Sequence, residues 1–419
     1  YGVTPLALAA ENGDAAMMQL LLEAGADVNA AAGEGETVLM TAARTGRPEA
    51  VKLLLAHGAD PNAAERQFGE TALMWAAGHG HADAIRALAA GGANLNAHAA
   101  TIDLPPTKVN FSFAVVTALP RGGLTALMYA ARQGEVDAVT ALAESGADLN
   151  AVDPEGTTAL VIAIINAHYD VAAQLAKLGA DPNVGDAAGM AALYAAVDMV
   201  HMSPFVNRPS PRASGDLSAA DLVSVLLEHG ADPNAALRAP LLMRQHNGGD
   251  PSLGNGATPL MRAAKAADVA LMRTLLDHKA DPSRKMANGT TALLAAVSGR
   301  PGPLTPDAPM FQAVRLLLDR GADVNAAAAN GETLLHRGVT RGEPFVRMLA
   351  ERGAKLDLKD GGGRTPLDVA LGVPPPAPAG RGPGAGAGGP PGAPAAPVRA
   401  DDATIALLRK LGAPRGSAE

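Results

Sequence analysis

Residues 4–29, TPLALAAENGDAAMMQLLLEAGADVN, carry the pattern that decides the fold of this 419-residue chain. The stretch opens on a Gly-x-Thr-x-Leu start, with its threonine at Thr4, and closes on a Gly-Ala-Asp-x-Asn end that begins at Gly25. The start returns at Thr37, 33 residues after Thr4. It occurs ten times, with alanine in place of threonine once, at Thr4, Thr37, Thr71, Thr125, Thr158, Ala191, Thr258, Thr291, Thr333 and Thr365.

Two rows of leucines follow the same period. Leucine stands two residues after every start, and leucine also stands four residues before every end. The ends begin at Gly25, Gly58, Gly92, Gly146, Gly179, Gly230, Lys279, Gly321, Gly353 and Gly412. Because such rows do not arise by chance, we predict ten copies of one structural unit.

Each copy predicts two short helices followed by a turn. The Thr4 hydroxyl caps a first helix, and Pro5 is tolerated at its first position. Leu6 and the small residues after it form one apolar face, and Gly13 ends this helix. A second helix ends at Gly25, where a left-handed cap requires no Cβ. One such pair cannot bury its apolar face alone, so the copies must stack. At Lys279 the same cap forces a left-handed lysine, which predicts a locally weak seventh unit.

The period and the Thr-Pro-Leu motif at residues 4–6, 258–260 and 365–367 resemble the ankyrin repeat. This resemblance spans the chain apart from its insertions. It implies an all-α fold, an ankyrin-type α-solenoid of helix-turn-helix repeats joined by β-hairpin-like loops. It also implies that the concave surface, built from hairpin tips and first helices, binds other proteins. His336 occupies the family's histidine position, where the resemblance implies hydrogen bonds between adjacent units.

The breaks in the period set the predicted domain limits. Residues 1–372 hold repeats one to nine and the first helix of the tenth, 373–400 form a Pro/Gly-rich disordered insertion, and 401–419 hold the second helix of the tenth repeat and a C-terminal tail. Smaller insertions lie near 97–120, 201–218, 235–255 and 299–309. Insertions in a solenoid form loops and often carry function.

One insertion differs from the others because its apolar residues alternate. Residues 109–115, VNFSFAV, suit an extended ribbon with one apolar face and include Phe111 and Phe113. This finger folds back on the solenoid to complete its core, or it binds a partner. The sequence leaves both interpretations open.

Composition narrows the function classes. The net charge is −8 with no basic cluster, which disfavours nucleic-acid binding. The chain has no cysteine, which removes thiolate catalysis and Cys-ligated metals. The apolar run Ala159–Ile165 is far shorter than the ~20 residues of a membrane span. We predict no catalytic residue, no cofactor and no metal site. His79 and His81 flank Gly80, and we favour a structural role over a metal pair because no third ligand stands nearby.

Candidate binding residues are those that vary between copies on the expected concave surface. Aromatic and arginine side chains dominate interface energetics. The candidates are Glu36, Phe68 and Glu70 at hairpin tips, Trp75 and Tyr129 on first helices, Arg44, Arg132 and Arg341 at first-helix ends, and Phe111 and Phe113 in the finger. For Trp75 and Tyr129, ordinary packing between repeats is an equal alternative. We expect repeats two to four and the finger to form the main contact region.

The sequence therefore predicts a non-enzymatic, monomeric interaction scaffold that binds an unidentified protein. One alternative is a ligand- or partner-binding accessory domain of a larger enzyme or redox protein whose catalytic part lies outside this chain. An enzyme whose site lies within an insertion is a weaker alternative. The chain begins inside a repeat at Tyr1, so we expect its natural N-terminus to be missing. The composition resembles ankyrin-repeat proteins of high-GC bacteria, which favours an exported or periplasmic location over a cytoplasmic one by resemblance alone.

Overall fold

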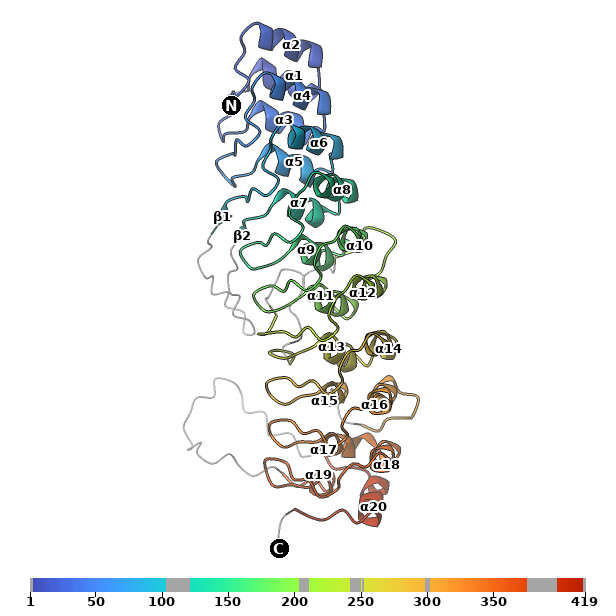
Figure 1. Ribbon diagram of the computed structural model, residues 1–419. Coiled ribbons are helices and arrows are strands. Elements are labelled where there is room, and N and C mark those ends of the chain that lie inside the picture. Colours follow the sequence, from blue (N-terminus) through green and yellow to red (C-terminus); the bar gives the residue numbers. More distant parts are fainter. Residues whose placement is uncertain are drawn as a thin grey trace, which may run out of the picture. The chain divides into compact units, whose positions relative to one another are not determined.

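The computed structural model describes residues 3–102, 121–202, 211–241, 250, 252–297, 302–374 and 398–416. These residues contain twenty α-helices, one short 3₁₀ helix and two strands of two residues each. The predicted all-α fold is confirmed. The chain divides into two compact units, Tyr1–Leu253 (unit 1) and Gly254–Glu419 (unit 2), and each is described by itself (Figure 1).

In unit 1 the helices follow one another as pairs joined by short turns. The pairs are α1 (Pro5–Asn12) with α2 (Ala15–Glu23), α3 (Val38–Arg44) with α4 (Pro48–Ala56), α5 (Ala72–Gly78) with α6 (Ala82–Ala90), α7 (Ala126–Gln133) with α8 (Val136–Glu144), α9 (Ala159–Ile165) with α10 (Tyr169–Lys177), and α11 (Ala192–Val200) with α12 (Ala219–Glu228). First helices pack on the first helices of the next pair and second helices on second helices, as Figure 1 shows for α3 on α5 and α4 on α6.

Unit 2 repeats this arrangement. Its helices are α13 (Pro259–Lys265) with α14 (Val269–Asp277), α15 (Ala292–Ala296) with α16 (Pro309–Asp319), α17 (Leu334–Gly338) and the 3₁₀ helix η1 (Val339–Arg341) with α18 (Glu343–Glu351), and α19 (Pro366–Ala370) with α20 (Asp402–Lys410). The number of repeats, ten, remains a prediction of the sequence.

The two leucine rows form the core of the stack. The leucines of the start row are at most 4% exposed throughout, and those of the end row are fully buried from Leu54 onward, whereas Leu21 is half-buried. Most of the predicted threonine caps are present; for example, the Thr4 hydroxyl accepts the N–H of Ala7 at 3.1 Å. The Thr333 hydroxyl instead lies 2.8 Å from His336 Nδ1. Helix α11 forms after Ala191 without any side-chain cap, because the packing of its buried face outweighs the missing hydrogen bond.

Hairpin-like loops join the pairs, as predicted. Single antiparallel bridges close several of them, for example Ala31 with Thr37 and Val152 with Thr158. Neighbouring hairpins also bond to each other, since the N–H of Arg66 donates to the carbonyl of Glu34 at 2.8 Å. Such bonds recur in both units and join most neighbouring hairpin tips beside the first helices.

The asparagine of the repeat end joins consecutive repeats. Asn29 Nδ2 donates to the carbonyl of Gly58 at 3.1 Å, and Asn29 Oδ1 accepts the N–H of Asp60 at 2.9 Å. The same arrangement recurs at Asn62, Asn183 and Asn325. The sequence indicated turn chemistry here, but the bonds to the following repeat emerge only from the structure.

Several predicted insertions border on parts of the chain that lie outside the described residues. Strands β1 (Thr101–Ile102) and β2 (Arg121–Gly122) pair antiparallel on either side of the finger, and the finger residues Phe111 and Phe113 lie outside the described residues. So does most of the predicted disordered segment 373–400, namely 375–397. The predicted insertion 201–218 falls between α11 and α12, and its limits remain a prediction.

Lys279 adopts the left-handed conformation that its position in the repeat predicts, with φ of 71°. Changing Lys279 to glycine is expected to raise the free energy of unfolding of the surrounding helices by about 1 kcal/mol, because the strain of a left-handed Cβ disappears. Amide hydrogen exchange in α14 should slow by about fivefold.

Lys279→Ala is the matched control for this change, because it removes the long side chain but keeps the Cβ. Exchange in α14 should therefore not slow in this variant. Equal exchange rates in the glycine and alanine variants would contradict the assigned strain.

Candidate functional site

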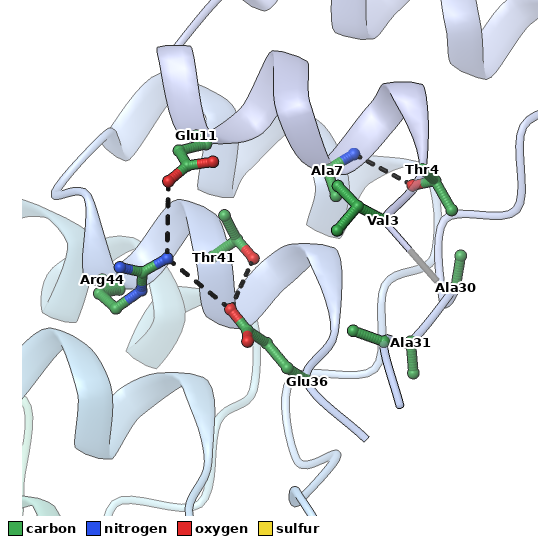
Figure 2. A pocket seen from close by; sticks show the side chains of 10 residues that line it. Val3, Thr4, Ala7, Glu11, Ala30, Ala31, Glu36, Thr41 and Arg44 are labelled. Atoms are coloured by element: carbon green, nitrogen blue, oxygen red, sulfur yellow. Dashed lines mark hydrogen bonds and ion pairs between the residues drawn. The ribbon is translucent and has the colours of Figure 1, made fainter. Parts of the chain in front are cut away.

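A pocket of about 180 Å³ opens in unit 1 between the first hairpin and the helices α1 and α3 (Figure 2). Its walls carry small or apolar side chains, and polar side chains converge on one side of it. The lining residues are Val3, Thr4, Ala7, Glu11, Ala30, Ala31, Ala32, Glu36, Thr41 and Arg44. The pocket therefore lies on the surface made by hairpins and first helices, which we call the inner face.

Three positions in each repeat build the inner face of unit 1. They lie one residue before, four residues after and seven residues after the start position. The first position holds Val3, Glu36 and Glu70 in repeats one to three. The second position holds Leu8, Thr41, Trp75, Tyr129 and Ile162 in repeats one to five. The third position holds Glu11, Arg44, Gly78 and Arg132 in repeats one to four. Because each helix turn repeats after 3.6 residues, the last two positions share a helix side.

Arg44 is the centre of the first group of side chains. Its guanidinium lies 3.9 Å from Glu11, 3.8 Å from Glu36 and 5.8 Å from the centre of the Trp75 ring. Figure 2 shows Glu11 and Glu36 approaching it from α1 and from the start of α3. Glu36 also accepts a hydrogen bond from the Thr41 hydroxyl at 3.2 Å. Three repeats thus contribute to one charged and aromatic cluster.

Tyr129 is the centre of the second group. Its hydroxyl donates to Glu70 at 2.5 Å, and the guanidinium of Arg132 lies 5.0 Å from the ring centre. Burial, then the hydrogen bond to Glu70 and that residue's negative charge, raise the pKa of Tyr129 well above its ordinary value. Tyr129 is 9% exposed, so most of its ring packs between repeats. Arg132 remains exposed beside it.

The hairpin tip that carries Phe68 is held by a buried carboxylate. Glu65 accepts the N–H groups of Gln67 and Phe68 at 2.6 Å and that of Glu70 at 3.0 Å. Burial alone would raise the pKa of Glu65, but these hydrogen bonds lower it overall. The Phe68 side chain, 43% exposed, is therefore presented from a rigid tip.

The structure brings most of the predicted candidates together. Glu36, Arg44 and Trp75 form the first group, and Glu70, Tyr129 and Arg132 form the second. Phe111 and Phe113 lie outside the described residues. Arg341 belongs to unit 2 and is 5% exposed, so it is not part of the inner face of unit 1.

Several residues of this face were not predicted from the sequence, among them Leu8 and Glu11. Leu8 occupies the position of Trp75 and Tyr129 in the first repeat and is 50% exposed, and Glu11 occupies the position of Arg44 and Arg132. Alignment of the ten copies on their start positions would have identified both residues, because it places them beside the predicted candidates.

His79, His81 and His336 each place a ring nitrogen within hydrogen-bond distance of a backbone carbonyl. His79 Nδ1 lies 2.8 Å from the carbonyl of Trp75, and His81 Nε2 lies 2.9 Å from that of Arg44. His336 Nε2 lies 3.0 Å from the carbonyl of Arg364 in the next pair, so the predicted bond between repeats is confirmed. Across the described ranges, no three His, Asp or Glu side chains are grouped to hold a metal ion.

The helices are short. None in the described part of the chain has both the length and the apolar character that crossing a membrane requires.

Comparison with known families agrees with the repeat period. A model of three ankyrin repeats matches residues 1–65 and 107–199, and a single ankyrin repeat model matches residues 68–99, 255–286 and 288–329. A search of curated proteins finds no match. Ankyrin repeats are in general modules of protein–protein interaction. Since these matches cover more than half of its length and the helix pairs follow the same period, the chain belongs to the ankyrin repeat family.

Proposed function

We propose that the chain is a non-enzymatic scaffold whose protein partner binds the inner face of unit 1 over repeats two to four. The observation that carries this proposal is the pair of arginine–aromatic contacts on adjacent first helices, Arg44 with Trp75 and Arg132 with Tyr129. Arginine and large aromatic side chains are the types that contribute most to interface affinity.

The mechanism is binding by a preformed surface. Glu65 and the bonds between hairpins fix the tips, and the stacked first helices fix the side chains behind them. A partner therefore loses little free energy in ordering this surface. The side chains of Phe68 and Arg132 are exposed to solvent in the free protein and are therefore available to contact a partner. The finger between β1 and β2 remains a predicted addition to this surface.

The proposal is tested by proximity labelling with the full chain in its native host. The double change Phe68→Ala and Arg132→Glu is expected to lower recovery of the labelled partner by about tenfold or more, since interface anchors of these types cost about 2 kcal/mol each when lost. Lys52→Glu on α4 is the control, because it reverses a charge on an exposed second-helix position. Equal recovery with the double variant and the wild type would overturn the proposal.

A further inference from the structure

We propose that the pocket between α1 and α3 receives a lysine or arginine side chain of the protein partner. This inference rests on the proposed function, because it names the chemistry of one contact on the same inner face. It concerns repeats one and two, whereas the test above concerns Phe68 and Arg132. One experiment can therefore contradict the pocket and another the proposed binding surface, independently of each other.

The first argument is an unbalanced charge in the pocket. Glu11 and Glu36 share the single guanidinium of Arg44, so the three groups carry a net charge of −1 (Figure 2). Their distances to Arg44, 3.9 and 3.8 Å, are well beyond the 2.7–2.9 Å of a close charge-assisted hydrogen bond. The side chains of Glu11 and Glu36 are 52% and 34% exposed. Both carboxylates therefore keep room for a second cation.

The third repeat provides an internal comparison. Glu70 occupies the position of Glu36, and its carboxylate is closed by the hydroxyl of Tyr129 from the next repeat at 2.5 Å. For Glu36 the residue at the corresponding position of the next repeat is Trp75, which has no hydroxyl to donate. Glu36 accepts a hydrogen bond from Thr41 of its own repeat, whereas Glu70 accepts one from Tyr129 of the next repeat. The following repeat therefore covers Glu70 and leaves Glu36 accessible.

Arg44 can give up its ion pair with one of the two carboxylates and still keep a stabilising contact. Its guanidinium also lies against the Trp75 ring, and a cation over an aromatic face is stabilised by the ring quadrupole. When a partner cation enters between Glu11 and Glu36, Arg44 keeps this aromatic contact. The four charges are then balanced.

The walls of the pocket fit the rest of a basic side chain. Lysine and arginine lay their aliphatic stems along apolar surface while the charged end stays near polar groups. Val3, which is 57% exposed, and Ala7 and Ala31 offer such a surface beside the carboxylates. The pocket, about 180 Å³ in volume, accepts one extended side chain rather than a folded segment.

The surrounding charge favours the same kind of partner. Residues 1–102 contain eleven Asp and Glu against five Lys and Arg, a net charge of −6 out of −8 for the whole chain. A field of one sign raises the rate at which oppositely charged partners arrive. A basic segment is therefore attracted to repeats one to three before it contacts the pocket.

The test uses the full chain with three capped tripeptides, Gly-Arg-Gly, Gly-Lys-Gly and Gly-Glu-Gly, observed by methyl NMR. We expect the arginine or lysine peptide to shift the methyl signals of Ala7, Ala31 and Thr41, and the glutamate peptide to leave them unchanged. The double change Glu11→Gln and Glu36→Gln should lower the affinity for the basic peptide by about fivefold or more, whereas Glu49→Gln on α4 should leave this affinity unchanged. Binding should also weaken with salt.

The outcomes separate this inference from the proposed function. Absence of shifts with both basic peptides, or equal shifts with the glutamate peptide, would overturn it even if partner recovery depends on Phe68 and Arg132. Shifts at Ala7, Ala31 and Thr41 that disappear in the double glutamine variant would support the pocket even if partner recovery does not depend on Phe68 and Arg132.

Discussion

Replacing Phe345 with alanine is expected to lower the free energy of unfolding of the helices around α18 by about 3–5 kcal/mol, the largest effect we expect from any single change. Phe345 is fully buried, and its ring meets that of Phe311 edge to face with 5.5 Å between centres. Truncation to alanine removes this contact and leaves a cavity that its rigid neighbours cannot fill.

Phe345 is exceptional in its repeat position. The corresponding residue is alanine in four other repeats, Ala50, Ala84, Ala138 and Ala313, and in no other repeat is it aromatic. Gly338 opens the space for the larger ring, since a Cβ at that glycine would lie 2.9 Å from the Phe345 ring. The larger ring of Phe345 is thus accommodated by the missing side chain of Gly338 in the same repeat.

The effect should be local because each repeat contacts only its neighbours. Trp75, the single tryptophan of the chain, belongs to unit 1, so its fluorescence reports on unit 1 alone. In urea, circular dichroism of the Phe345→Ala variant should show an early loss of helix while the Trp75 transition stays at the wild-type concentration.

Phe68→Ala is the control for this prediction. It makes the same chemical change at an exposed hairpin tip and should alter stability by no more than about 0.5 kcal/mol. A Trp75 transition that moves together with the helix signal in Phe345→Ala would show that the two units unfold as one, which contradicts the local model.

The repeat register explains how much of the fold the sequence could predict. Each start leucine and threonine cap stands at a fixed place in a short helix, so burial and capping follow from spacing alone. The left-handed Lys279 was predicted for the same reason. Ala167 and Ala267 are also left-handed, at the turn where Gly13 and Gly134 stand elsewhere. They were missed because alanine carries no compositional signal of such a turn.

The candidate site could be predicted less completely because it depends on contacts between repeats. Spacing places Trp75 and Tyr129 on one side of their helices, but it does not show that Tyr129 reaches back to Glu70 or that Arg44 lies against Trp75. At Arg341 the register itself changes. Helix α17 ends at Gly338 and the 3₁₀ helix η1 follows. Arg341, at the end of η1, is therefore buried, unlike Arg132 at the end of its first helix.

Asp368 is the second residue for which we expect a large effect. Its carboxylate is 1% exposed, and one oxygen accepts the N–H of Thr365 at 3.0 Å and that of Gly416 at 2.6 Å. The other oxygen lies 3.7 Å from the Arg415 guanidinium. The hydrogen bonds and the ion pair of this carboxylate therefore join the residues after α20 to the beginning of α19.

Burial alone would raise the pKa of Asp368, but the hydrogen bonds from Thr365 and Gly416 and the charge of Arg415 lower it overall. A carboxyl whose pKa is lower when folded stabilises the fold above its unfolded pKa, near 4. This stabilisation is lost as the pH falls through the lower folded pKa. The protection factors of the α19 and α20 amides, that is, the intrinsic exchange rate divided by the observed rate at the same pH, should therefore fall below about pH 4.

Changing Asp368 to asparagine is expected to lower the free energy of unfolding of α19 and α20 by about 2–4 kcal/mol at pH 7 and to reduce this pH dependence, because a neutral amide replaces a charge that accepts several donors. Asp402→Asn is the matched control. The Asp402 side chain is 90% exposed and pairs with Arg399 at the surface, so its loss should cost less than about 1 kcal/mol. If both variants showed the wild-type exchange rates and pH profile, the Asp368 carboxylate would not be what holds the C-terminal residues in place.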